Sequence, residues 1–562
     1  MNRTFKVVFS KVRGTMVVAS EAAATPHKKA AKTVIAAAAA LAMGTVMAQE
    51  WAPESALDLV NTPVTQGQLE GNSQFDYTLD GAQTGGFLSV SEGEVIFGKD
   101  VWVTGTNSAR SHALHAKGDK VELTNTGNIY VQAGEGADSW SQKGMIVGDG
   151  AKIINEGNIV AKNAYGMTIE NNGKASNIFN NGRIDVLEQG AGIELGGVAG
   201  SLAVNNGTIT VGEITEERSG LIFGHGVLIN TSNNTFVNNG TISAEGENAS
   251  AIEVKDGATG ATVILGSTSK VLGKIHFSDT AEKSKLIADG AVDTIDLVSE
   301  AKDLELDIRN EANITLKNGN ASTYSQVNIE DGRLNASIWQ DDNKFQNVTV
   351  NEDGIFNIQD LNAGGDRDQE HNQEGVTPHD TLLLAFDSVY NLNGGELWVA
   401  GSNYQDKLKV GTAATSGTLN IASGSYTYST LEVAKKGTVN VQGGELNVMD
   451  LAFSAGNENN VGKVTVGNNG SLNIAGTLTA GGAADGSLVN DGTLKLNYSN
   501  FFESSVGEDG APNWSTTDNV ALVSGTGVID LTGVTGEYTL DDLKKRRQFS
   551  VTGFRLCSLK VL

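Results

Sequence analysis

The stretch NEGNIVAKNAYGMTIE, residues 155–170, contains the pattern that decides the fold. It opens on Asn-x-Gly-x-Ile, formed by Asn155, Gly157 and Ile159, and continues as apolar residues that alternate with polar ones. Alternation with a period of two predicts short, half-buried β-strands. Asn and Gly tolerate positive φ angles, so the opening phrase predicts a sharp turn between two strands.

The opening phrase occurs five times, with successive copies 25 to 33 residues apart. The predicted repeat-turn positions are Asn125 and Gly127, Asn155 and Gly157, Asn180 and Gly182, Asn205 and Gly207, and Asn238 and Gly240. A second phrase, a small residue followed by alternating apolar positions, falls between these copies at Gly144, Gly166, Gly192, Gly226 and Ala251. Two interleaved phrases with one period indicate a repeated structural unit. Such a unit buries its apolar face only by stacking on its neighbours, with strands about 4.8 Å apart.

From about residue 330 the phrase changes to Gly-x-Leu/Val-Asn-Ile/Val, as in residues 354–358, 417–421 and 437–441. We expect a turn glycine, two inward apolar residues and an outward Asn, with the Asn side chains of successive units able to stack in a ladder. The fold class predicted is all-β, a right-handed parallel β-helix preceded by a cleaved helical signal segment. A string of β-sandwich domains is the alternative, but a 25-residue period and only 5 prolines favour the solenoid.

The composition of the 562 residues narrows the function classes. The formal net charge is −26, which argues against nucleic acid and anionic membranes as partners. The 69 glycines follow no strict period of three, so collagen is excluded. The single cysteine is Cys557, so no disulfide can form between residues 49 and 543.

The amino end has the pattern of a secretory signal. Lys28, Lys29 and Lys32 precede an apolar run at residues 34–46 that ends in Val-Met-Ala. The run is shorter than the roughly 20 apolar residues that a membrane-spanning helix needs. We therefore predict cleavage between Ala48 and Gln49.

The segment before this signal, MNRTFKVVFSKVRGTMVVASE at residues 1–21, resembles the extended signal peptide region of type V secretion in autotransporters and related exoproteins of Gram-negative bacteria. The family usually has Trp where this chain has Phe9 and Met16. The matching positions are Met1-Asn2-Arg3, Phe5-Lys6-Val7-Val8, Ser10-Lys11, Gly14-Thr15, Val17-Val18 and Ser20-Glu21. The repeats also look like the β-helical passengers of autotransporters.

This resemblance implies a route of secretion and does not imply a particular biochemical activity. The expected partners are the inner-membrane secretion machinery, signal peptidase, an outer-membrane barrel and an unidentified ligand on a host or bacterial surface. The expected location is the periplasm in transit, and then the cell surface, the outer membrane or the medium. The expected segments are an extended signal region (1–24), a signal peptide (25–48), cap strands (49–100), a β-helix with Asn-x-Gly-x-Ile repeats (101–330), a β-helix with Gly-x-Leu-Asn-Ile repeats (331–543) and a basic tail (544–562).

The carboxy end departs from the pattern of the rest. A self-delivering autotransporter is expected to continue into a barrel of roughly 12 tilted strands, and this sequence has no such region. Instead it ends in LKKRRQFSVTGFRLCSLKVL, residues 543–562, which is basic and contains Cys557. We expect a frameshift near Lys544 rather than a naturally basic tail.

Candidate chemical sites are few. His112 and His115 are three residues apart, a spacing that places strand residues on opposite faces and so predicts no shared metal. The acidic segment 364–380 could hold a hard cation such as calcium, although a solvated loop is the favoured interpretation. No catalytic residue, metal ligand or cofactor is predicted.

Three classes of function fit these observations. The leading one is a secreted or surface-displayed passenger with a structural or adhesive role and no catalysis. An exoprotein of two-partner secretion is an alternative, although its early Asn-Pro-Asn motifs are absent. A glycan-active enzyme on the same scaffold is the second alternative, which carboxylates beside Trp or Tyr in a groove would support.

The predicted processing can be tested directly. We expect amino-terminal sequencing of the exported protein to give Gln49 as the first residue, because Ala48 ends the signal. Recovery of Met1 in the exported material would refute the targeting hypothesis.

Overall fold

The computed structural model describes residues 85–532 with short gaps, and four strands before them. The acidic segment 364–380, the apolar run 34–46 and the basic tail 544–562 lie outside the described residues. The gaps within 85–532 are 106–110, 134–141, 172, 213–223, 245, 247–248, 318–321, 340–343, 363–380, 386, 400–406, 455–461, 484–486, 507–511 and 518.

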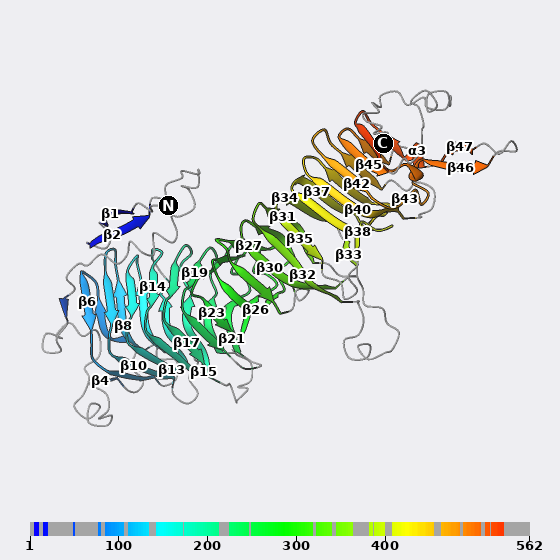
Figure 1. Cartoon of the computed structure of the whole chain (residues 1–562). Helices are drawn as coiled ribbons and strands as arrows, with labels where there is room; N and C mark the ends of the chain where they lie inside the picture. Colours follow the sequence, from blue (N-terminus) through cyan, green and yellow to red (C-terminus); the bar gives the residue numbers. More distant parts are fainter. Residues whose placement is uncertain are drawn as a thin grey trace.

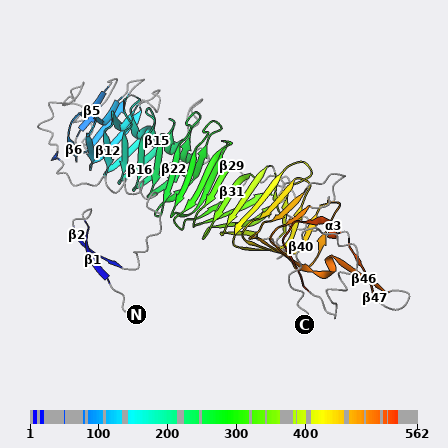
Figure 2. The same ribbon diagram turned by 90° about the horizontal axis from the view of Figure 1, so that it is seen from above.

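The described chain forms one elongated stack of β-strand coils, a parallel β-helix (Figures 1 and 2). The predicted all-β fold class is confirmed. The described helical structure amounts to the α-helix α3 (Asn519–Leu522) and the 3₁₀ turn η4 (Tyr498–Asn500). Two antiparallel pairs stand apart from the coils: β1 (Phe5–Ser10) with β2 (Thr15–Ser20), and β46 (Phe502–Val506) with β47 (Pro512–Thr516).

One coil illustrates why the sequence folds this way. Strand β12 (Lys152–Asn155) ends at the repeat turn, and β13 (Asn158–Ile169) follows it. Strand β13 bends at Asn163, whose φ is 49°, so that its two halves pair with different neighbours. The next coil begins at β14 (Asn177–Asn180), which pairs with β12 in parallel register. The coils therefore stack as three parallel ladders.

The first face is a continuous ladder. Its strands are β3 (Gln49–Glu50), β6 (Glu94–Phe97), β9 (Glu122–Asn125), β12, β14, β16 (Leu202–Asn205), β19 (Thr235–Asn238), β22 (Thr262–Gly266), β25 (Lys285–Asp289), β27 (Leu304–Arg309), β29 (Tyr324–Ile329), β31 (Phe345–Asn351), β34 (Ser388–Asn393), β37 (Gly417–Ser423), β39 (Gly437–Val441), β41 (Lys463–Val466), β44 (Leu488–Asn490) and β48 (Val523–Ser524).

The second face follows the first in each coil. Its strands are β4 (Tyr77–Leu79), β7 (Val101–Gly105), β10 (Asn128–Ala133), the first half of β13, the first half of β15 (Arg183–Leu195), β17 (Thr208–Val211), β20 (Thr241–Ala244), β23 (Lys270–Leu272), β26 (Val292–Ser299), β28 (Asn313–Leu316), β30 (Arg333–Trp339), β32 (Ile355–Asn362), β35 (Glu396–Val399), the first halves of β38 (Ser425–Val433) and β40 (Glu445–Phe453), β42 (Ser471–Ile474), β45 (Thr493–Asn497) and β49 (Val528–Thr532).

The third face closes each coil. Its strands are β5 (Gly85–Val90), β8 (Ser111–Lys117), β11 (Lys143–Gly148), the second halves of β13 and β15, β18 (Gly224–Ile229), β21 (Ala249–Val254), β24 (Lys274–Phe277) and the end of β26, and later β33 (Thr381–Leu384), β36 (Lys407–Val410), the second halves of β38 and β40, and β43 (Leu478–Thr479).

The inside of the coils is a continuous apolar core. In β27, for example, Leu304, Leu306 and Ile308 are buried while the residues between them are half-buried. Farther along, the rings of Tyr324 and Phe345 from successive coils stack inside the solenoid, with centroids 4.7 Å apart. Phe356, in the same coil as Phe345, packs against that ring at a tilt, with centroids 5.3 Å apart. Each fully buried large apolar side chain contributes about 1.5–3 kcal/mol, so the stacking itself holds the fold together.

The glycine of the repeat turn is required because the backbones of neighbouring coils approach closely there. The sequence pattern predicts a positive φ at this glycine, and that prediction is wrong. The φ angles of Gly127, Gly157, Gly182, Gly207 and Gly240 are all outside the left-handed region. A Cβ built on Gly182 would lie 2.1 Å from the carbonyl oxygen of Gly157 in the preceding coil. The same clash recurs at the other four glycines, at 2.0 to 2.4 Å. The backbone of the next coil therefore fits only where the side chain is a hydrogen atom.

The asparagine of the repeat turn forms a ladder of side-chain hydrogen bonds inside this turn. The Nδ2 of Asn155 donates to Oδ1 of Asn180 at 2.8 Å and to the carbonyl oxygen of Gly157 at 3.2 Å. The same amide-to-amide bond joins Asn125 to Asn155, Asn180 to Asn205 and Asn205 to Asn238, at 2.8 to 2.9 Å. All five amides are 0% exposed. Because buried polar groups are costly when unpaired, each amide depends on those of its neighbours.

The second face contains interruptions. Within the described residues no ladder pairing joins β23 to β26 of the next coil. A second interruption follows β35. Strand β35 pairs with β32, but within the described residues no ladder pairing joins β35 to β38 of the next coil. The other two faces continue across this step, through β34 with β37 and β36 with β38. The hydroxyl of Tyr426 spans the beginning of the interruption and donates to the carbonyl oxygen of Gly395 at 2.7 Å.

We predict that Gly182→Ala lowers the free energy of unfolding by about 1–3 kcal/mol, the usual cost of overpacking, because its Cβ meets backbone at 2.1 Å. Urea unfolding followed by circular dichroism measures this change. Gly467→Ala is the matched control, since its Cβ would lie 3.4 Å or more from any neighbour and its φ is not positive. Equal effects of the two substitutions would contradict the close-approach explanation.

Candidate functional site

The ten predicted repeat-turn positions form a structural column rather than a binding site. They lie at or just after the ends of β9, β12, β14, β16 and β19 on the first face. Their amides are buried and bonded to one another, so they offer no exposed group to a ligand. The predicted cleavage position places Gln49 at the start of β3, where it pairs with Val95.

All four histidines within the described residues point outward from the third face. The prediction that His112 and His115 lie on opposite faces is wrong: their rings make an edge contact with centroids 5.2 Å apart. The alternation of β8 breaks at Ala113 and Leu114, which are both buried. Ala113 occupies the bend that Gly144 and Gly166 occupy in the next coils, and these small residues are the second repeat phrase.

The bend of the third face admits only small side chains. A Cβ on Gly166 would lie 2.5 Å from the carbonyl oxygen of Gly192, and one on Gly192 would lie 2.7 Å from that of Gly226. At the bend two consecutive residues, such as Ala113 and Leu114, both point into the core. The residues that follow the bend therefore point outward one position later than strict alternation predicts. Sequence spacing alone therefore misplaces His115, because a period of two holds only for an unbent strand.

Burial lowers the pKa of two of these histidines. The pKa of His112 falls to about 3, through burial first and then through the charges of His115 and Lys143. The pKa of His225 falls to about 4, again chiefly through burial. His225 is only 5% exposed, and its Nδ1 has no hydrogen-bond partner among the residues that the structure describes. Both side chains are therefore neutral in the folded protein at pH 7.

His276 has the opposite behaviour because it bonds a carboxylate. Its Nδ1 lies 2.8 Å from Oε1 of Glu253, and this hydrogen bond raises its pKa more than burial lowers it. Burial alone would raise the pKa of Glu253, but the bond and charge of His276 lower it overall. Ser250 donates to the other oxygen of Glu253 at 3.0 Å. Serine and histidine thus both bond the carboxylate, an arrangement unlike a nucleophilic triad, in which histidine lies between the two.

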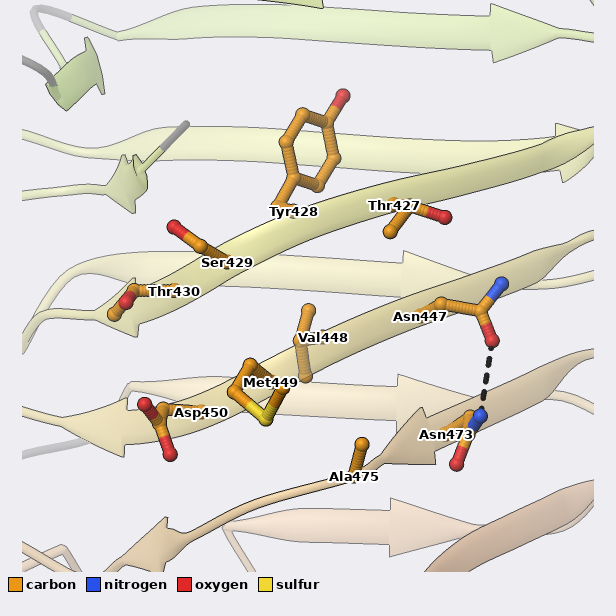
Figure 3. A pocket seen from close by; sticks show the side chains of 10 residues that line it. All are labelled: Thr427, Tyr428, Ser429, Thr430, Asn447, Val448, Met449, Asp450, Asn473 and Ala475. Atoms are coloured by element: carbon orange, nitrogen blue, oxygen red, sulfur yellow. Dashed lines mark hydrogen bonds between the residues drawn. The ribbon is translucent and has the colours of Figure 1, made fainter. Parts of the chain in front are cut away.

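A separate hollow of about 540 Å³ lies where β38 and β40 bend from the second face to the third (Figure 3). Its polar lining includes Asn447, Asn473 and Asp450, and Figure 3 shows Asn473 bonded to Asn447, at 3.1 Å. Met449 at its edge is 55% exposed. The Oδ1 of Asp450 accepts hydrogen bonds from the backbone and hydroxyl of Thr477, at 2.8 and 2.6 Å.

Sequence reasoning missed this hollow, although part of its signal was present. The Gly-x-Leu-Asn-Ile phrases correctly place Asn447 and Asn473 outward on neighbouring strands. What they do not reveal is that the strand bends two residues later, at Met449. The bend turns a flat amide row into one wall of a concave surface.

Metal and membrane features are limited in the part of the chain that the structure describes. There, no group of three or more His, Cys, Asp or Glu side chains is placed to hold a metal ion. In the same residues, none of the helices is long and apolar enough to cross a membrane.

Fold and amino end together define an exported parallel β-helix protein. Residues 1–49 match the family model Extended Signal Peptide of Type V secretion system, which confirms the predicted extended signal peptide and supports an autotransporter. The chain is thus exported along a route related to type V secretion, which involves the secretion machinery and signal peptidase. No curated protein and no solved structure shows significant similarity to it.

We predict that His225 makes the fold acid-sensitive. Its pKa is about 4 in the folded state and near 6.5 in the unfolded state, so the unfolded state binds more protons between these values. Stability therefore falls as the pH drops from 6.5 to 4, by about 3 kcal/mol from this group. Urea unfolding at several pH values should show a shallower loss for His225→Gln.

His276→Gln is the control of opposite sign. The folded pKa of His276 is raised, so its contribution is fully present below pH 6.5 and is lost as the pH rises through the folded value. This substitution should lower stability most at acid pH. Parallel pH profiles for the wild type and both variants would contradict the assignment.

Proposed function

We propose that the chain is a secreted or surface-displayed passenger whose β-helix has an adhesive role. The observation that carries the proposal is the combination of a type V extended signal peptide with an elongated parallel β-helix. A long solenoid presents the same kind of outward surface many times. Repeated weak contacts along such a surface combine into strong attachment through effective concentration.

The outward residues of the second half support this role. Asn420 and Asn440 form an outward amide row with Asn391, through bonds of 2.8 Å. Lys409 and Glu432, in register on neighbouring strands, form an ion pair of 2.7 Å. Such rows give a rigid polar surface whose donors and acceptors are fixed before any ligand arrives, which lowers the entropic cost of binding.

In this proposal, the hollow of Figure 3 favours the binding of a ligand over the hydrolysis of a glycan. Hydrolysis of a glycosidic bond generally uses a pair of carboxyl groups on either side of it. The lining of the hollow includes one carboxylate, Asp450. The glycan-active enzyme therefore stands behind the adhesive passenger in this proposal.

The adhesive proposal predicts that beads coated with the exported protein attach to epithelial cell layers or bacterial lawns. We expect at least about tenfold more attachment than for beads coated with a globular protein of equal negative charge, since multivalent display multiplies weak contacts. Attachment no greater than that control, on every surface tried, would refute the adhesive role while leaving the export route intact.

A further inference from the structure

Arg333 on the second face has an unusual environment. Three arginines lie within the described residues, and two of them pair with carboxylates: Arg183 with Asp185 at 2.7 Å, and Arg309 with Asp289 at 3.0 Å. The guanidinium of Arg333 instead lies over the indole of Trp398, with its Cζ 4.4 Å from the ring centroid. Its Nε is buried and, like the Nε of Arg309, has no hydrogen-bond partner among the described residues. No carboxylate among the described residues forms an ion pair with this cation, although the protein has a net charge of −26.

Trp398 is one of the few large apolar residues that the described surface exposes, at 44%. It lies on β35, which borders the interruption of the second face. Its Nε1 donates to the carboxylate of Glu396, which fixes the orientation of the indole. The Arg333 guanidinium lies over one face of this indole, so the part of the ring that a ligand can contact is the exposed remainder.

An amide row ends at the same indole. Asn335 donates to Asn313 and Asn357 donates to Asn335, both at 2.9 Å. Trp398 occupies the next position in register after Asn357, so the row stops there. The Oδ1 of Asn357 therefore remains an open acceptor, among the described residues, beside the ring.

The three groups together fit one ligand chemistry. A guanidinium fork binds a carboxylate through two parallel hydrogen bonds, and it remains charged at every physiological pH. An aromatic face packs against the C–H groups of a sugar ring, and an amide oxygen accepts from a hydroxyl. A carboxylate, a hydroxyl and an apolar ring face occur together in a uronic acid residue.

We propose that Arg333, Trp398 and Asn357 form a binding site for a carboxylate-bearing saccharide of the uronic acid class. The proposal rests on the adhesive function and specifies the ligand chemistry at one site. The single fork matches a glycan with one carboxylate per residue. The acidic remainder of the protein repels any anionic glycan, and it repels a densely sulfated chain more strongly because that chain has more negative charges per residue.

The test uses the purified full chain and two probes, a short oligouronate and the same oligosaccharide with its carboxyl groups reduced to alcohols. Isothermal titration should show binding of the first and binding about tenfold weaker or more for the second, because the charge-assisted bonds are lost. Arg333→Gln should weaken oligouronate binding about tenfold and reduce the loss of affinity that added salt causes.

Matched variants separate a binding role from a structural one. Trp398→Ala should weaken binding about tenfold, whereas Trp398→Phe should retain most of it. Arg183→Gln, an exposed arginine on another coil, should change nothing. Circular dichroism verifies that each variant keeps the fold.

The proposal is overturned if the reduced oligosaccharide binds equally well, if a sulfated glycan binds in preference, if neither probe binds, or if Arg333→Gln and Arg183→Gln behave alike. Bead attachment separates this result from the adhesive proposal. Attachment that survives Arg333→Gln would refute this site and leave the adhesive role standing. Specific oligouronate binding without bead attachment would support this site and refute the adhesive role.

Discussion

The backbone of every coil must lie within hydrogen-bond distance of the backbone of the preceding coil. This requirement leaves the least space at the repeat turn. There a carbonyl oxygen occupies the space that a Cβ would need, as between Gly157 and Gly182. The same turn encloses the side chains of Asn155 and Asn180, and the amide of Asn155 donates a hydrogen bond to the amide oxygen of Asn180. Steric exclusion and buried hydrogen bonding thus select two residue types at fixed spacing, and the rest of the coil can vary around them.

This constraint explains how much of the fold the sequence could predict. The repeat turns, the period of the coil and the all-β class follow from residues such as Asn180 and Gly182, because every coil repeats the same local demand. The predicted reason for the glycine, a positive φ, is wrong, however. The atom that excludes a side chain there belongs to another coil, and the local backbone angles of the glycine do not reveal it. Contacts between coils become visible only when the register is known.

The candidate sites were harder to predict because they arise where the strands depart from regularity. The contact of His112 with His115 depends on a bend, and so does the concave surface beside Met449. The stacking of Arg333 on Trp398 joins residues 65 positions apart across the rung of Ile355 and Asn357. No spacing rule within a single repeat anticipates such a pair, whereas the outward direction of Asn357 was anticipated correctly.

The interruption between β35 and β38 has a mechanical consequence. Hydrogen bonds between coils run along the long axis, so a pull on the two ends loads successive rungs in series, and the weakest rung yields first. At this step the second face contributes no described ladder pairing, and the same is true of the step from β23 to β26, so two described ladders carry the load at each. Under tension the coils should separate first at such a step, where two described ladders carry the load, and the coils on either side should stay intact. The indole of Trp398 lies on β35, at the edge of one of these steps.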